Sequence, residues 1–490
     1  MKHVNRAVES LLILALSATP ALAAVRSESS MSIPDDQITG AIETELLVND
    51  AVPAEDINVM TRDGIVTLDG SVNNLLARER ASEVAESIKG VRAVVDEIEV
   101  KPVPRSDLEI QGDVTAAFAS DPLTRDDGIA VSVHDGHVTL DGRGDSFAKQ
   151  RLVTEIAEGV RGVKSVENDI TVELEHERPD ADIATEIRAL LRDDVRIDPG
   201  AVGVAVKDGK VTLSGDVSSA WERTLAKRKA WVAGVRAVDV SGLEIAWWRA
   251  DDSLRQDAET ADLSDADIDR AVAGVLAQDP RVQAFDVIAD ASYGTVTLTG
   301  EVDNLKAKQA AAEDAQNTIG VWRVENHLRV RPDSAFSDAE LVTRVYDALG
   351  RDPFVGWHDI SVAATNGTVR LYGDVDTDFE KREATDVAYR VGGVLAVDNA
   401  LNVSAEQPLK SDTAIRDDVE SQLYWDAAVN GGEVQVSVDG GAVTLTGAVD
   451  TWYEYTQAAQ DAYEGGATSV RNDLQVRSTP AKGAPLATNS

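Results

Sequence analysis

The apolar residues of this chain first show the period of an amphipathic helix. Ile183, Ile187, Leu190 and Leu191 fall at positions i, i+4, i+7 and i+8 of such a stripe, which predicts the buried face of a helix. Two strings of the capping-box type predict where further helices begin, at Ser264-Asp265-Ala266-Asp267 and Ser337-Asp338-Ala339-Glu340. Three Asp-Pro pairs predict where such helices end, at Asp121-Pro122, Asp279-Pro280 and Asp352-Pro353.

The pattern then changes to period-two alternation, which is typical of strands. Two alternating runs, residues 57–60 and 65–72, flank Asp63-Gly64. Asp-Gly supplies the positive φ angles that a tight turn needs, so the sequence predicts a β-hairpin. Gly70 falls on the same face as the apolar residues of the second run. A glycine there either lets a helix approach closely or marks a bulge or bend.

A second helical stripe and a closing strand follow the hairpin. Ala77, Ala81, Val84 and Ile88 have helical spacing, and Gly90 predicts the end of that helix. The next run, residues 91–100, is expected to be a strand. The unit therefore has the order helix, strand, strand, helix, strand, and we expect an α+β fold with two helices on one face of a three-stranded mixed sheet.

This unit is repeated along the chain, because a string of the type Gly-x-Val-x-Leu-x-Gly occurs six times. The first glycines of successive strings lie 72, 73, 85, 73 and 74 residues apart, which predicts six tandem modules and one longer linker. The expected modules are residues 35–103, 106–175, 180–246, 264–331, 337–404 and 411–477. The acidic linker, 250–263, is expected to divide them into two groups of three with freer movement between the groups, and residues 478–490 are expected to form a disordered tail.

Composition limits the partners of the chain. Asp and Glu outnumber Lys and Arg by 86 to 47, giving a net charge of −39. A nucleic-acid partner is not expected, because binding to a polyanion needs a basic surface. The chain has no cysteine, which excludes disulfides, thiol catalysis and the lipid-bearing cysteine of a lipoprotein.

The first residues predict export. Residues 1–24 combine Lys2 and Arg6, an apolar run from Leu11 to Leu16 and an Ala21-Leu22-Ala23 cleavage site, which is typical of a signal peptide. The apolar run is too short to span a membrane, and no later run is long enough. We therefore expect a periplasmic protein without a transmembrane span in the mature chain, and not a lipoprotein.

The repeated hairpin string, with a later Gly-Val before the last strand, resembles the BON domain of bacterial osmotically inducible and nodulation proteins. The resemblance covers roughly residues 35–477. It implies a periplasmic or envelope protein associated with osmotic or envelope stress, with phospholipid surfaces as proposed ligands, and it implies no reaction. The second module departs from the pattern at Arg143-Gly144 and the sixth at Gly465-Gly466-Ala467, so both are expected to pack less regularly.

No motif in the sequence predicts catalysis, a cofactor or a metal site. His134 and His137 flank a hairpin turn, but two ligands rarely make a site, and ordinary solvated histidines are the alternative. Paired acids are expected by chance in so acidic a chain. P-loop, Rossmann, EF-hand, nucleophile-elbow and zinc-protease strings are all absent from the sequence. We therefore predict that the protein is not an enzyme.

One segment of the third module departs from the acidic background. The second helix of that module, between Trp221 and Trp231, gathers cations and aromatic residues, a mixture that favours an anionic lipid surface. The candidate contact residues are Arg223, Lys227, Arg228, Lys229 and Trp231. In the alternative interpretation, Trp231 packs on a neighbouring module while the cations pair with acidic residues.

The leading hypothesis is a non-enzymatic scaffold that engages envelope phospholipid, or periplasmic and outer-membrane proteins, through weak contacts multiplied along the array. The alternative hypothesis is a chaperone-like protein that protects periplasmic partners without binding lipid.

Overall fold

The computed structural model describes residues 33–125, 128–144, 146–172, 178–198, 200–249, 263–283, 285–332, 336–404 and 410–477, without the side chains of residues 55 and 249. The predicted signal peptide, the acidic linker except its last residue, and the predicted tail lie outside these residues. No helix among the described residues is long and apolar enough to cross a membrane.

The first module has the predicted order of elements. Helix α1 (Asp35–Val48) precedes strands β1 (Ile57–Arg62) and β2 (Ile65–Val72), helix α2 (Leu75–Ser87) and strand β3 (Ala93–Val100). The sheet has the order β1-β2-β3, in which β1 and β2 are antiparallel and β2 and β3 are parallel. The parallel pair is possible because α2 provides the crossover connection. The sheet is therefore mixed, as predicted.

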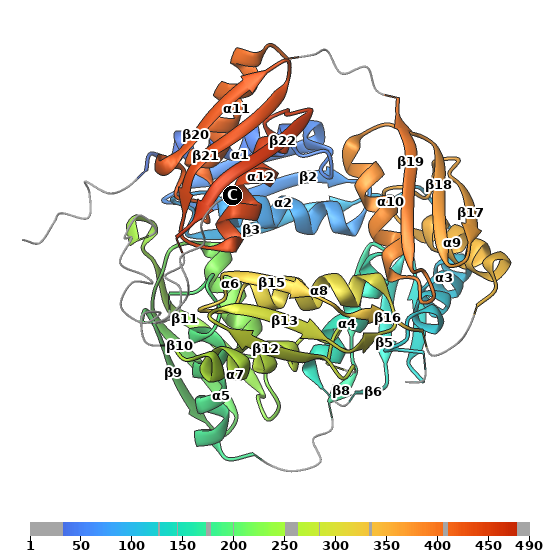
Figure 1. Cartoon of the computed structure of the whole chain (residues 1–490), viewed down its shortest axis with the longest axis horizontal. Helices are drawn as coiled ribbons and strands as arrows, with labels where there is room; N and C mark the ends of the chain where they lie inside the picture. The colour runs from blue at the N-terminus through green and yellow to red at the C-terminus, as the bar shows by residue number, and fades with distance from the viewer. Residues whose placement is uncertain are drawn as a thin grey trace, which may run out of the picture. The chain divides into compact units, whose positions relative to one another are not determined.

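The other five modules repeat this arrangement (Figure 1). The second comprises α3 (Asp107–Ser120), β4 (Ala130–His134), β5 (His137–Asp141), β6 (Arg143–Gly144), α4 (Phe147–Glu158), β7 (Ser165–Asn168) and β8 (Thr171–Val172). The third comprises α5 (Asp180–Arg192), β9 (Val202–Lys207), β10 (Lys210–Val217), α6 (Ala220–Lys229) and β11 (Ala237–Ile245). The fourth comprises α7 (Asp265–Leu276), β12 (Ile288–Ser292), β13 (Thr295–Thr299), β14 (Glu301–Val302), α8 (Leu305–Gln316), β15 (Arg323–Asn326) and β16 (Arg329–Val330). The fifth comprises α9 (Asp338–Arg351), β17 (Ser361–Thr365), β18 (Thr368–Val375), α10 (Asp378–Arg390) and β19 (Ala396–Val403). The sixth comprises α11 (Asp412–Trp425), β20 (Val434–Asp439), β21 (Ala442–Val449), α12 (Trp452–Glu464) and β22 (Ser469–Val476).

Each module buries one face of its sheet beneath its two helices. In the first module, the side chains of Ile42, Val66, Leu68, Ala77 and Ala81 are fully buried. The small alanines of α2 let this helix approach the sheet closely. The apolar positions predicted from the helical and strand periods are therefore core residues.

An aspartate at the start of the first helix is bonded to the hairpin turn in every module. In the first module, the carboxylate of Asp35 accepts hydrogen bonds from the N–H groups of Asp63 (2.8 Å) and Gly64 (3.0 Å). Equivalent bonds reach the first glycine of each string from Asp107, Asp180, Asp265, Asp338 and Asp412. The bond ties the helix to a turn 28 or 29 residues later. Sequence analysis did not predict it.

The second glycine of five of the six strings has a positive φ angle and lies against main chain rather than against an α-helix, which excludes the interpretation that it lets a helix approach. Five of these glycines have φ angles from +123° to +139°, namely Gly70, Gly215, Gly300, Gly373 and Gly447. A side chain on each would meet the carbonyl oxygen of the residue fourteen positions earlier. Only glycine tolerates this conformation easily.

The second module is less regular, as predicted, since its hairpin strand is divided into β5 and β6. The fourth module is divided in the same way at Gly300, between β13 and β14, which the sequence did not predict. The prediction of irregularity in the sixth module is wrong for its sheet. Strand β21 pairs with β22 in an unbroken register of eight residues, because Gly465 and Gly466 are accommodated between α12 and the last strand.

The modules are joined by main-chain hydrogen bonds in a nested order. In the first and sixth modules, the N–H of Lys89 donates to the carbonyl of Trp425 (3.0 Å), and that of Ala427 to Ser87 (2.9 Å). In the third and fourth, the N–H of Val195 donates to Asn317 (3.0 Å) and that of Ile319 to Asp193 (2.9 Å). The second and fifth are joined by a bond from Arg161 to Arg351 (2.7 Å).

Every such pair connects the end of a first helix with the end of a second helix, and every pair joins a module before the linker to one after it. The modules therefore do not form the two separate groups of three that were expected from the sequence. Helices also contact helices between modules, as in α2 with α6, α3 with α9, α5 with α7 and α8 with α10. The side of a module that carries its helices therefore faces other modules.

Candidate functional site

Helix α6 of the third module positions the predicted cluster of cations and aromatic residues. Ser219 caps its start by accepting a hydrogen bond from the N–H of Glu222 (3.0 Å). The buried carboxylate of Glu222 accepts bonds from the N–H (2.7 Å) and hydroxyl (2.6 Å) of Ser218. Lys227, Arg228 and Lys229 occupy the last turn, where cations interact favourably with the helix dipole. The local sequence therefore fixes where these cations lie.

Two of the five predicted contact residues pack within the protein. The ring of Trp231 lies 5.0 Å from that of Phe147 in α4, at an interplanar angle of 52°, so it contacts the second module. The ammonium group of Lys229 is 2.6 Å from a carboxylate oxygen of Asp194. These contacts are those of the alternative interpretation, in which the tryptophan packs on a neighbour and the cations pair with acids.

Asp194 is a fully buried carboxylate between two cations. Arg196 binds it with two nitrogens, at 2.8 and 2.7 Å, in addition to Lys229. Burial alone would raise the pKa of Asp194, but Arg196 and Lys229 overcome this effect and hold the pKa well below its usual range. This carboxylate also lies beside the junction between the third and fourth modules, where Asp194 and Thr318 form an isolated antiparallel β-bridge.

A cavity of about 730 Å³ lies between the second, third and fourth modules. Its cationic lining residues, defined here as the cation cavity set, are Arg151, Arg196, Arg228, Lys229, Arg236 and Arg281. Its acidic lining residues are Glu155, Asp279 and Asp314. The aromatic side chains of Phe147 and Trp231 form another part of the wall. Three of the predicted contact residues, Arg228, Lys229 and Trp231, are therefore brought together at this cavity.

Arg228 has no carboxylate within ion-pair distance among the described residues, unlike Lys229 beside it. Its side chain is accessible to solvent because it lines the cavity, and the walls of the cavity surround it with protein. Burial lowers the pKa of Arg228, and the neighbouring Arg151 and Arg196 lower it further. The guanidinium group therefore lies where an additional negative charge would be stabilised.

The remaining two predicted contact residues lie outside the lining of this cavity. Lys227 is exposed, and Arg223 is half-buried beside Glu86 of the first module. Thr224 donates a hydrogen bond to that Glu86 (3.1 Å). The structure thus separates the five residues into a cavity group and a surface pair.

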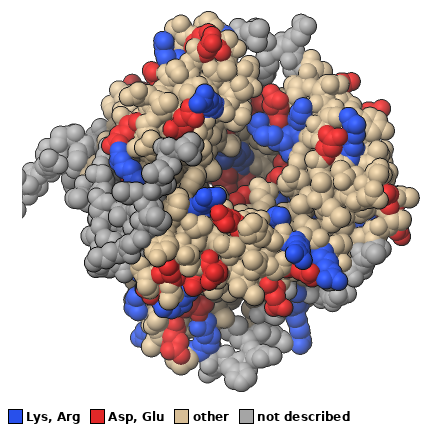
Figure 2. All heavy atoms as spheres, viewed as in Figure 1, with Lys and Arg blue, Asp and Glu red and all other residues tan. Residues whose placement is uncertain are grey.

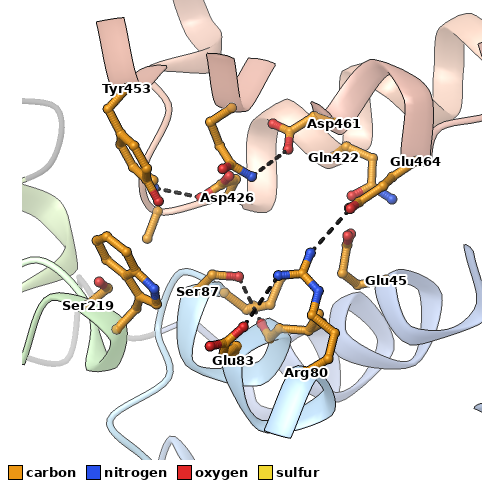
Figure 3. Close-up of a pocket in the computed structure, with 16 residues that line it drawn as sticks. Glu45, Arg80, Glu83, Ser87, Ser219, Gln422, Asp426, Tyr453, Asp461 and Glu464 are labelled. Carbon is orange, nitrogen blue, oxygen red and sulfur yellow. Dashed lines mark hydrogen bonds and ion pairs between the residues drawn. The ribbon is translucent and has the colours of Figure 1, made fainter. Parts of the chain in front are cut away.

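A second, smaller cavity of about 60 Å³ lies between the first, third and sixth modules (Figure 3). Arg80 of α2 approaches Glu464 of α12 at 3.2 Å. Burial and the carboxylate of Glu464 raise the pKa of Glu45 to about 9, and burial raises the pKa of Asp426 to about 6. Burial and Asp426 raise the pKa of Asp461 well above its ordinary value. This junction therefore holds acids that favour their protonated form.

One histidine, His358, belongs to a group of three side chains that could hold a metal ion, and it is the one such group among the described residues. Atoms of His358, Asp376 and Glu380 lie within 4.8 Å of one another, and the Nε2 of His358 is 3.1 Å from Glu380. Glu380 also caps α10, accepting bonds from the N–H groups of Asp376 (2.7 Å) and Thr377 (3.1 Å). Structural capping already accounts for this carboxylate.

His134 and His137 face each other across the second hairpin, as the sequence predicted, and both are exposed. His134 lies 3.6 Å from Asp135, while His137 contacts Ser165 at 2.7 Å. The two histidines therefore contact different side chains, Asp135 and Ser165.

Charges of both signs are interspersed on the face of the molecule in Figure 2, where Lys and Arg stand among Asp and Glu around a central hollow. The described residues of this face do not form a broad basic patch. The sequence identified Arg228 and Lys229 as unusual, but it did not identify Arg151, Arg196, Arg236 and Arg281. These arginines belong to three modules, and no local spacing connects them.

Repeated small α+β modules, with cavities at two of their junctions, define a multi-module architecture. The chain belongs to the BON domain family, as predicted, since the family model matches residues 34–102, 106–173, 179–246, 264–332, 337–405 and 411–478.

Two characterised relatives share this domain. Osmotically-inducible protein Y of Escherichia coli is 32% identical over 143 residues, which cover 28% of this chain and 71% of that protein. Outer membrane lipoprotein DolP of Haemophilus influenzae is 31% identical over 140 residues, covering 28% and 72%. A solved structure of CdsD, a structural protein of the type III secretion system of Chlamydia trachomatis, is 15% identical and covers 42% of this chain and 91% of its own, with a TM-score of 0.13. This last likeness supports no further conclusion.

Proposed function

We propose that this protein is a non-enzymatic scaffold of the bacterial periplasm, associated with osmotic or envelope stress, that binds anionic envelope surfaces through several modules at once. The names of the two relatives, one osmotically inducible and one an outer-membrane lipoprotein, support the envelope assignment. The sequence of residues 1–24 supports export.

The orientation of the modules is the observation that carries this proposal. Helices are the elements that pack between modules, which leaves the opposite face of a sheet available. In the first module, Met60 and Ile65 on that face are 62% and 43% exposed. Several sheet faces held by one nested assembly would act together, so weak single contacts would add to useful avidity.

The surface pair of α6, Arg223 and Lys227, is the proposed first contact with anionic phospholipid. Cations near such a surface contribute about 1 kcal/mol each. Arg228, Lys229 and Trp231 complete the predicted cluster, but Lys229 and Trp231 also support internal contacts. A five-residue alanine variant would therefore disturb folding as well as binding.

The absence of an enzymatic role is part of the proposal. A nucleophile, a base and an orienting group within hydrogen-bond reach are the minimum for most hydrolytic sites. The perturbed carboxyl groups at the first and sixth modules are explained by burial at a module junction. They do not require a reaction.

Vesicle co-sedimentation of the full mature chain tests the proposal. We expect binding to anionic but not zwitterionic vesicles, weakened by high salt and by the double variant Arg223→Gln/Lys227→Gln. A matched control is Arg188→Gln/Arg270→Gln, which removes two exposed cations from helices α5 and α7 rather than from a sheet face. No sedimentation of the intact protein at low salt would overturn lipid binding, and equal loss in the control would overturn its assignment to α6.

A further inference from the structure

We propose that the cavity between the second, third and fourth modules binds a phosphate-bearing anion of metabolite size. This site goes beyond the surface binding proposed above and does not depend on it, because the surface pair lies outside its lining.

The charge of the lining carries the inference. The cation cavity set supplies six cations against three lining acids, in a chain where acids outnumber cations by 86 to 47. Asp314 reduces the acidic share further, because burial and Asp279 raise its pKa well above the ordinary value. The cavity is thus a local positive region inside an acidic protein, which would concentrate small anions.

The cations are also held in place. Arg281 binds Asp279 through two nitrogens, with a shortest distance of 2.6 Å. Arg196 and Lys229 share Asp194, and Arg151 lies 3.2 Å from Glu155 one helical turn away. These pairs orient the cations at little entropic cost on binding, since their rotamers are already restricted.

Arg228 takes part in none of these pairs and has no carboxylate within ion-pair distance among the described residues. It lies on the last turn of α6 and is close enough to Arg151 and Arg196 for both to disfavour its charge, an effect that Glu83 and Glu155 oppose more weakly. An anion bound here would relieve that repulsion and occupy the donors of a planar guanidinium group. Guanidinium groups match the geometry of phosphate oxygens in a bidentate manner.

The size and remaining wall indicate the ligand class. A volume of about 730 Å³ is that of a small-molecule site, larger than inorganic phosphate requires. Phe147 and Trp231 form an aromatic part of the wall, which suits the organic part of a phosphate ester. The ester could be a soluble metabolite or the headgroup of a phospholipid, and the experiment distinguishes these sources.

Isothermal titration of the full mature chain with glycerol 3-phosphate, at low salt, is the first test. We expect saturable binding that weakens about tenfold or more in Arg228→Gln. Arg228→Lys should retain part of the affinity, because lysine keeps the positive charge but lacks the planar guanidinium group that binds phosphate in a bidentate manner. Arg188→Gln, an exposed change on α5 of the same module and outside the lining, should bind as the unaltered protein does. Circular dichroism of each variant verifies that the fold is retained.

Vesicles that contain phosphatidylglycerol form the second arm. Binding of the soluble ester that Arg228→Gln loses supports the proposal with a metabolite as the source. Vesicle binding that is lost in Arg228→Gln and retained in Arg223→Gln/Lys227→Gln supports it with a lipid headgroup as the source. Absence of both, or equal binding by Arg228→Gln in both arms, would overturn the cavity proposal. Loss of vesicle binding only in the double variant would leave the surface proposal standing alone.

Discussion

The carboxylate of Asp107, in the first turn of α3, accepts a hydrogen bond from the N–H of Gly136 at the hairpin turn (3.0 Å). The second oxygen accepts one from the N–H of Asp135 (2.9 Å). One side chain thus links the first helix to the hairpin. Its recurrence in all six modules makes it a defining contact of this fold.

We expect Asp107→Asn to loosen the hairpin of the second module. An amide accepts through one oxygen and without charge, so one of the two bonds is lost and the other weakened. Amide hydrogen exchange of β4 and β5 should become about three- to tenfold faster. Asp141→Asn, an exposed change in the same hairpin, is the control and should leave exchange unchanged.

The same contact predicts sensitivity to acid. The bonds from Gly136 and Asp135 lower the pKa of Asp107, so its stabilising effect is complete above the unfolded pKa of about 3.9. The effect should be lost as the pH falls further, through the folded pKa. Exchange in β4 and β5 should therefore approach that of Asp107→Asn in acid, after correction for the intrinsic rate. A constant difference between the two proteins down to pH 2 would contradict this.

Glycine is required at the end of the repeated string in five modules but not in the second. Gly215 has a φ of +124°, and a side chain there would meet the carbonyl oxygen of Ala201. We expect Gly215→Ala to lower the free energy of unfolding by about 2–4 kcal/mol. Gly142→Ala is the matched change, because its nearest contact would be 3.7 Å away, and it should cost less than about 1 kcal/mol. Equal costs in chemical denaturation would refute this account.

The junction of the first and sixth modules should weaken as the pH rises. The pKa of Glu45 is raised from 4.5 to about 9, so the folded state binds this proton more tightly than the unfolded chain does. The free energy of unfolding therefore decreases between about pH 4.5 and pH 9.

Glu45→Gln removes this dependence, since the amide is neutral at every pH. We expect it to stabilise the protein by on the order of 1–3 kcal/mol at pH 8, and to have little effect at pH 5. Differential scanning calorimetry at both pH values measures the difference. Glu43→Gln, exposed on the same helix, should leave the pH dependence as it is. A variant at position 45 that is no more stable at pH 8 would show that Glu45 is ionised there.

Asp194→Asn should destabilise the third and fourth modules. The change leaves Arg196 and Lys229 without their shared buried counter-charge. Removal of one partner from a buried ion pair costs about 3–5 kcal/mol. Chemical denaturation checks this against Asp182→Asn, an exposed change on α5 that should cost less than about 0.5 kcal/mol.

Local pattern was sufficient to predict each module. The stripe from Ile183 to Leu191 and the Asp-Gly turns predicted helices and hairpins, because burial on one face imposes a period of 3.6 or 2 on the residues of an element. Family membership followed from the same strings. The close approach of main chain to Gly215 was not predicted, because a missing side chain does not by itself reveal what occupies the space.

Tertiary structure alone decided how modules meet and what the cations do. Lys89 and Trp425 are joined by main-chain atoms, which carry no residue-specific signal across more than 300 positions. Sequence singled out Arg228 and Lys229 as a group, yet the fold gives Lys229 a buried partner and turns Arg228 toward a cavity. The sequence determined the repeated module, because its contacts recur at short, fixed spacings. The environment of each charge depended on distant surfaces brought together by packing, and only the folded chain specifies those.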